Sequence, residues 1–131
     1  MAAATARAST GPAILTGVRK WLLLFAAIAV EVTGTLSLRA SQDHSAWLVL
    51  VVTGYLASFY FLALVLRAGM PVGVAYGVWG AIGTAATAVL AALIFGDPFT
   101  APIIVGIVLI IAGVLMVELG SRHVADEEGA P

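Results

Sequence analysis

The chain contains no cysteine. It therefore has no disulfide, no thiolate metal ligand and no thiol nucleophile. Charge is also scarce, because Asp, Glu, Lys and Arg make up 10% of the 131 residues, against about 25% in soluble proteins. The formal net charge of −1 lacks the basic excess of a nucleic-acid-binding protein. The two histidines, His44 and His123, lie outside the apolar segments, and we interpret both as solvated residues. We expect no metal and no cofactor.

Apolar residues are abundant instead, at 62% of the sequence. They gather in four runs of about 18–25 residues, and about 20 helical residues cross the hydrocarbon core of a bilayer. Within lipid each backbone polar group needs an internal partner, so such runs form helices. The sequence predicts an all-α membrane protein, with a transmembrane domain at 19–122. Its four helices are predicted at 21–38, 46–66, 71–95 and 101–119.

Both ends of the chain differ in composition from these runs. Residues 1–18 contain a Gly11-Pro12 break and are predicted to form a disordered tail. Residues 123–131 are predicted to form an acidic tail. The first apolar run is too long for the 7–15-residue core of a signal peptide, and it carries Glu31. We therefore interpret it as a transmembrane helix.

Orientation follows from the basic residues beside the helices. With four spans, both termini and the second loop share one side of the membrane. That side carries five basic residues: Arg7, Arg19, Lys20, Arg67 and Arg122. The other side carries only Arg39. The sequence predicts a multi-pass protein of the inner (plasma) membrane with both termini in the cytoplasm.

Glu31 is the charge that lies deepest within an apolar run. Intramembrane acids are costly and usually mark an ion, proton or substrate path. Helical spacing places Ala27, Gly34 and Thr35 on the face of Glu31, which suggests open space beside the carboxylate. The second and third runs each carry a stripe that contains aromatic residues. Such stripes are often ordinary packing, but beside a carboxylate they also suit an organic cation, held by cation–π contacts.

Four segments together resemble the helices of the small multidrug resistance family. They are AVEVTGTLSLR, YLASFYFLALVL, MPVGVAYGVWGAIGTA and GIVLIIAGVLMVELGSR. The resemblance implies a proton-coupled antiporter, not an enzyme, that exports lipophilic or quaternary ammonium cations as an antiparallel dimer. It implies that protons and substrate compete for Glu31.

The resemblance also assigns roles to individual residues. The implied substrate cavity consists of Leu24, Ala27, Ile28, Gly34, Thr35, Tyr55, Ser58, Phe59, Tyr76, Trp79 and Gly83. Gly106 and Gly113 match the fourth-helix stripe that holds the family's dimer together.

Single positions refine the resemblance. The family's guanidinium exporters carry a Trp three residues after the glutamate, whereas this chain has Gly34, which favours the quaternary-ammonium subtype. The chain departs from the family at Gly80, where a hydroxyl residue is frequent, and at Glu118, where Asn is common. The first loop, RASQDHSAW, lacks the usual Gly-Phe-Thr pattern. These departures bear on which cations are carried.

Several alternatives stay open. A homodimer of antiparallel chains requires one sequence to insert in both directions, and the strong basic bias disfavours this. The chain is therefore alternatively one subunit of a heterodimer with an oppositely oriented paralogue. A guanidinium or polyamine exporter and a small dual-topology ion channel are further alternatives, although a pore favours several weak sites over one deep carboxylate. No metal cluster, nucleophile–base pair or phosphate loop indicates an enzyme.

Overall fold

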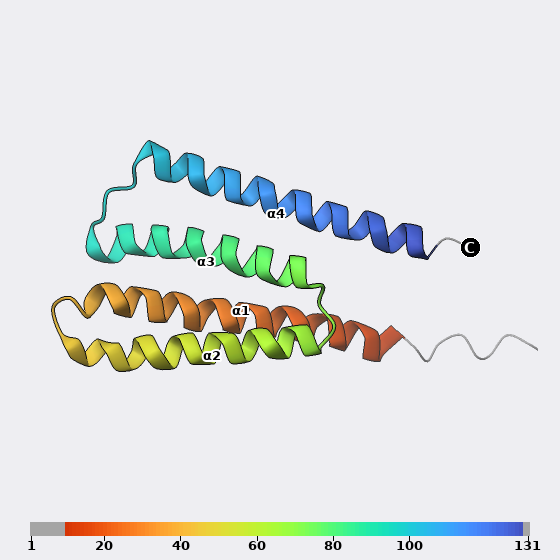
Figure 1. The fold of residues 1–131 in the computed structure, drawn as a ribbon, viewed down its shortest axis with the longest axis horizontal. Coiled ribbons are helices and arrows are strands. Elements are labelled where there is room, and N and C mark those ends of the chain that lie inside the picture. The colour runs from red at the N-terminus through yellow and green to blue at the C-terminus, as the bar shows by residue number, and fades with distance from the viewer. Residues whose placement is uncertain (1–9, 130–131) are drawn as a thin grey trace, which may run out of the picture.

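The computed structural model describes residues 10–129, which form four long helices and one short 3₁₀ helix (Figure 1). The elements in chain order are α1 (Thr10–Ala40), η1 (Ser45–Trp47), α2 (Leu48–Arg67), α3 (Val72–Phe95) and α4 (Ala101–Glu128). Within these residues the protein is all-α, as the apolar runs predict. Four helices are long and apolar enough to cross a membrane: Ala13–Ala40, Ser45–Arg67, Val72–Phe95 and Ala101–Glu128.

Glycine and proline set the helix boundaries. Gly69, in the turn between α2 and α3, has a φ of 89°, and Gly96, which caps α3, has a φ of 70°. Both values lie in the left-handed region, which glycine adopts without steric cost. Pro71 precedes α3 at its N-cap, where its missing N–H leaves no helical hydrogen bond unmade. The short connections make successive helices antiparallel.

The helices are arranged in the order α2, α1, α3, α4, as the ribbon shows from bottom to top (Figure 1). Helix α1 lies between α2 and α3, and within the described part of the chain α4 packs only against α3. The buried apolar core accordingly comes from the first three helices and the turn before α3. It comprises Leu24, Ile28, Val32, Leu62, Val65, Met70, Val74, Ala75 and Val78.

Both predicted tails differ from the structure where it describes them. Helix α1 begins at Thr10, so residues 10–18 of the predicted disordered tail are helical, while 1–9 lie outside the described residues. Pro12 is tolerated there because N–H groups of a first helical turn have no helical partner. Helix α4 continues to Glu128. Pairs four residues apart, Glu118–Arg122 and His123–Glu127, support this extension.

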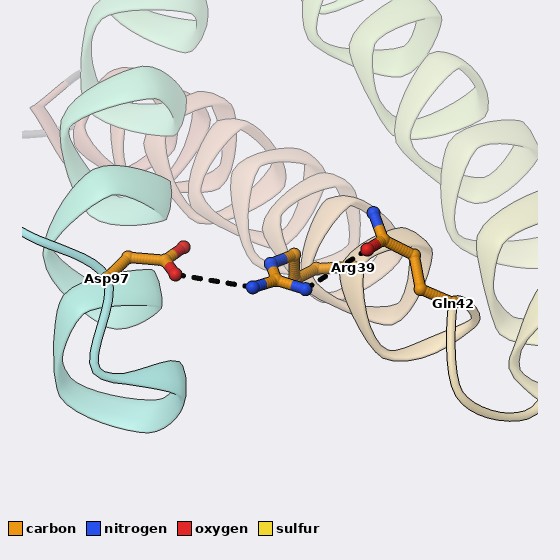
Figure 2. A network of polar contacts seen from close by, with 3 residues as sticks. All are labelled: Arg39, Gln42 and Asp97. Carbon is orange, nitrogen blue, oxygen red and sulfur yellow. Dashed lines mark hydrogen bonds and ion pairs between the residues drawn. The ribbon is translucent and has the colours of Figure 1, made fainter.

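The end of the bundle away from the described end of α4 carries a small polar network (Figures 1 and 2). Arg39 lies at the end of α1, and its Nη2 is 3.4 Å from Asp97 Oδ1 in the loop after α3. Its Nη1 donates a 3.2 Å hydrogen bond to Gln42 Oε1 (Figure 2). Its guanidinium also lies 5.5 Å from the ring centroid of Phe95. These contacts join α1 to the end of α3.

Candidate functional site

Glu31 lies deep within the membrane-spanning part of α1. Helical rise places it roughly 16 Å from Lys20 and roughly 12 Å from Arg39 along the helix axis. Glu31 forms no ion pair with any residue of 10–129. Its side chain is only partly exposed. A carboxylate in a medium of low dielectric is unfavourable without compensating partners, which marks Glu31 as a candidate binding position.

A chain of hydroxyl groups reaches the carboxylate from α2. The Thr35 hydroxyl donates to Glu31 Oε1 at 3.0 Å, and it lies 2.9 Å from the Tyr55 hydroxyl. The Thr35 hydroxyl also lies 3.0 Å from the Glu31 carbonyl oxygen of its own helix, and either hydroxyl can be the donor in the bond with Tyr55. Hydrogen bonds thus connect Tyr55, Thr35 and Glu31. This chain fixes one carboxylate oxygen and links α1 to α2.

The other carboxylate oxygen lies against α3. A Cβ atom placed on Gly83 would stand 2.8 Å from Glu31 Oε2, closer than real Cβ contacts allow. Gly83 is buried, and the absence of a side chain there makes room for the carboxylate. Glu31 therefore lies where α1, α2 and α3 meet, with glycine on one side and hydroxyls on the other.

Gly34, which helical spacing places on the face of Glu31, packs against the backbone of α2. It faces α2, where a Cβ on Gly54 would stand 2.8 Å from the Val30 carbonyl oxygen and 3.0 Å from Gly34 Cα. Two glycines thus let the backbones of α1 and α2 touch. Sequence reasoning missed Gly54, although it is the only glycine of the second apolar run. That isolation was the available signal.

The other predicted cavity residues of α1 are buried within the chain. Leu24 and Ala27 are fully buried and Ile28 is 4% exposed. Leu24 and Ile28 belong to the core shared by the first three helices. Ser58 on α2 is also fully buried. These four side chains therefore pack inside the single chain and do not line an open cavity in it.

The predicted aromatic residues do come together. The Trp79 ring packs edge-on against Phe59 at 5.8 Å and against Tyr76 at 5.9 Å between ring centroids. Phe59 is 55% exposed and Tyr76 is 46% exposed, so the cluster opens on the outside of the chain. Within residues 10–129, Trp79 Nε1 and Ser58 Oγ are buried and have no hydrogen-bond partner. Both retain an unused donor.

Gly106 and Gly113 lie on α4. A Cβ added at either would meet nothing within 4 Å, so neither contributes to packing within the chain. The contact between α3 and α4 uses other small residues, because Gly73 lies near Val117 and Gly77 near Val114. Among residues 10–129 no group of three His, Cys, Asp or Glu side chains is placed to hold a metal ion.

Comparison with known proteins shows which family this chain resembles. The model of the family described as Small Multidrug Resistance protein matches residues 19–110. A multidrug transporter of Pseudomonas aeruginosa is 42% identical over 104 residues, covering 78% of this chain and 94% of the relative. The quaternary ammonium compound-resistance protein QacE of Escherichia coli is 40% identical over the same length and with the same coverage. The multidrug resistance protein mmr of Mycolicibacterium paratuberculosis is 40% identical over 105 residues, covering 79% of this chain and 98% of the relative. With its four membrane-spanning helices, this chain is a multi-pass membrane protein that belongs to the small multidrug resistance family.

Proposed function

We propose that the protein is a proton-coupled multidrug efflux transporter that exports lipophilic or quaternary ammonium cations in exchange for protons. One observation carries the proposal: Glu31 lies deep in α1 without an ion-pair partner in residues 10–129, between the Thr35 hydroxyl and Gly83. Its carboxylate offers a single acidic site that a proton or an organic cation can neutralise. The names of the relatives, which include multidrug and quaternary ammonium resistance proteins, support this substrate class.

Coupling follows from competition for the same oxygen atoms. A bound proton removes the negative charge that attracts the cation, and a bound cation occupies the oxygens that would take the proton. The two ligands therefore alternate, and each passage of a cation in one direction is tied to protons moving in the other. The Tyr55–Thr35 hydroxyl chain keeps the carboxylate oriented in both states.

The aromatic cluster of Trp79, Phe59 and Tyr76 supplies the apolar part of the site. Ring faces attract a quaternary ammonium by roughly 0.5–2 kcal/mol each through cation–π contact. A quaternary ammonium has no N–H to donate, so its recognition depends on charge and ring faces. A guanidinium instead needs several acceptors arranged in one plane. The aromatic cluster therefore favours the quaternary-ammonium subtype.

A second chain would complete the cavity. In one chain the residues around Glu31 are packed, while Phe59, Tyr76 and the glycines of α4 face outward. We propose that two oppositely oriented chains face each other, so that their Glu31 side chains share one cavity and α4 of each contributes to the contact through Gly106 and Gly113. Inverted repeats of this kind exchange inward-open and outward-open shapes.

The basic bias of the sequence bears on the second chain. Five basic residues lie on the side of the termini and one on the other, which predicts a fixed orientation in the inner membrane with cytoplasmic termini. Under this prediction the partner is a related chain of opposite orientation. Reporter fusions at the C-terminus check it: signal from only one side supports a heterodimer, and strong signal from both sides supports a homodimer.

The decisive test of transport is the Glu31→Gln variant in sealed vesicles, co-reconstituted with an oppositely oriented paralogue if the wild-type chain alone is inactive. A pH gradient should drive uptake of a quaternary ammonium cation by the wild type. Glu31→Gln should abolish this uptake, whereas Asp43→Asn, which removes an exposed loop carboxylate, should leave it unchanged. Undiminished gradient-driven uptake by Glu31→Gln would overturn the proposal, and passive conductance without exchange would favour a channel.

A further inference from the structure

A second polar site lies toward the end of α4, away from Glu31. A cavity of about 290 Å³ opens there between α1, the start of α3 and the end of α4. Its lining includes Lys20, Trp21, Pro71, Glu118, Ser121 and Arg122. The site is separate from Glu31, which lies roughly 16 Å along α1 from Lys20. Its polar residues are not among those assigned above to binding of the proton or the cation.

Glu118 carries an unused acceptor in this cavity. Arg122 donates to Glu118 Oε1 from Nε at 3.2 Å and from Nη2 at 2.9 Å. Glu118 Oε2 is buried and accepts no hydrogen bond from any residue of 10–129. Leaving such an oxygen unpaired costs about 1–3 kcal/mol, and more for a charged group. The site therefore calls for a donor that the described chain does not supply.

Lys20 provides the opposite charge across the same cavity. It makes no ion pair with residues 10–129. Its Nζ lies near the turn between α2 and α3, 3.8 Å from where a Cβ on Gly69 would stand. Among the described residues, the lining thus includes a residue whose ammonium group forms no ion pair and a residue with an unpaired carboxylate oxygen. A ligand that matches this lining carries both an anion and a hydrogen-bond donor.

The depth of the cavity indicates where that ligand comes from. Lys20 and Trp21 stand where the apolar part of α1 begins, and Arg122 follows the apolar part of α4. Basic and aromatic residues at such boundaries lie at the level of the lipid headgroups. Met70 and Val74 add apolar surface to the lining, which suits the glycerol end of a lipid.

We infer that this cavity binds the headgroup of phosphatidylethanolamine, with its phosphate at Lys20 and its ammonium at Glu118 Oε2. The ammonium supplies the missing donor as a charge-assisted hydrogen bond, which is about twice as strong as a neutral one. Phosphatidylcholine has the same charges but no N–H. Phosphatidylglycerol offers only neutral hydroxyl donors and brings an uncompensated negative charge near Glu118.

The headgroup series tests this inference directly. Native mass spectrometry of the full chain in detergent would measure binding of phosphatidylethanolamine, its mono- and dimethyl derivatives and phosphatidylcholine. Binding should persist while one N–H remains and fall about tenfold at phosphatidylcholine, the effect of losing one charge-assisted hydrogen bond. Equal binding of phosphatidylethanolamine and phosphatidylcholine, or stronger binding of phosphatidylglycerol, would overturn it.

Two variants with matched controls locate the site. Glu118→Gln should remove the preference for phosphatidylethanolamine over phosphatidylcholine, whereas Asp126→Asn, an exposed carboxylate on the same helix, should retain it. Lys20→Gln should weaken both lipids about equally, whereas Arg19→Gln should not, because Arg19 is exposed and outside the lining. Unchanged melting temperatures would show that each variant is folded. A Glu118→Gln variant with full preference would place the lipid elsewhere.

A separate experiment distinguishes a lipid headgroup from a soluble molecule of the same chemistry. Soluble phosphoethanolamine carries the same charges without acyl chains and should not displace the lipid at equal concentration. Displacement at equal concentration would assign the site to a soluble metabolite. The Glu31→Gln variant should bind phosphatidylethanolamine normally, which separates this inference from the proposed transport mechanism.

Discussion

The first three helices differ from α4 in how they pack. Helices α1, α2 and α3 share one buried core and bring Glu31, Tyr55 and Gly83 together. Among the elements of residues 10–129, helix α4 contacts only α3, and none of its most apolar window is buried. Small residues thus have two uses, because Gly34, Gly54 and Gly83 make contacts within the chain, whereas Gly106 and Gly113 of α4 make none within 4 Å in the described chain. The predictions below test this division, beginning with the largest expected effect.

Replacement of Gly113 by Leu should have the largest effect if α4 packs against a second chain. Residues at the centre of an interface cost about 2 kcal/mol or more when altered, which corresponds to roughly thirtyfold weaker association. Cross-linking in membranes should show the loss of dimer, while the chain keeps its helicity. Ala112→Leu adds the same side chain at an exposed neighbour on another face of α4 and should dimerise normally. Unchanged dimerisation of Gly113→Leu would remove α4 from the interface.

Replacement of Gly54 by Ala should instead damage the single chain. The new methyl would lie 2.8 Å from the Val30 carbonyl oxygen and 3.0 Å from Gly34 Cα, and backbone atoms cannot easily give way. Overpacking of this kind costs about 1–3 kcal/mol. Detergent-to-SDS unfolding followed by circular dichroism would measure it. Gly80→Ala, which meets nothing within 4 Å, should be neutral or slightly stabilising, and equal losses in both variants would contradict the assigned contact.

The contact of Gly34 with Gly54 also shows what the sequence could and could not predict. Hydropathy and length predicted four helices, and the structure bears them out. Helical spacing placed Gly34 and Thr35 on the face of Glu31, but it could not decide which neighbour each would meet. A helix face spans enough of the circumference to touch two partners, so Thr35 reaches Glu31 while Gly34 meets α2. The helical ends at 10–18 and 123–128 were missed, because they lie outside the apolar runs.

Replacement of Gly83 by Ala should act on the site rather than on the fold. The added methyl would stand 2.8 Å from Glu31 Oε2, and the end of a side chain can move where backbone cannot. Movement of the carboxylate should break its bond with Thr35, which at about 1.5 kcal/mol or more lowers cation affinity roughly tenfold or beyond. Equilibrium binding of a labelled quaternary ammonium would measure the loss of affinity. The free energy of unfolding should be the same as that of the wild type. Wild-type affinity would show that Oε2 does not need the space.

Replacement of Thr35 by Val should have a smaller effect, since the carboxylate keeps its place against Gly83. The variant loses the hydroxyl link between Tyr55 and Glu31, a contribution of about 1 kcal/mol or roughly fivefold in cation binding. Thr33→Val is the matched control, because the Thr33 hydroxyl is exposed and bonds only to the Ala29 carbonyl of its own helix. Equal effects of the two substitutions would mean that the hydroxyl chain does not reach the site.

Replacement of Asp97 by Asn should have the smallest effect. The Arg39–Asp97 pair is 3.4 Å apart with side chains that are 45% and 39% exposed, and exposed pairs of this kind contribute about 0–1 kcal/mol. Arg39 also keeps its contacts with Gln42 and Phe95, so the end of α3 should stay attached to α1. The melting temperature in detergent should move little and should lose its dependence on salt. A large drop would mean that this pair, rather than the glycine contacts and the buried core, holds the first three helices in register.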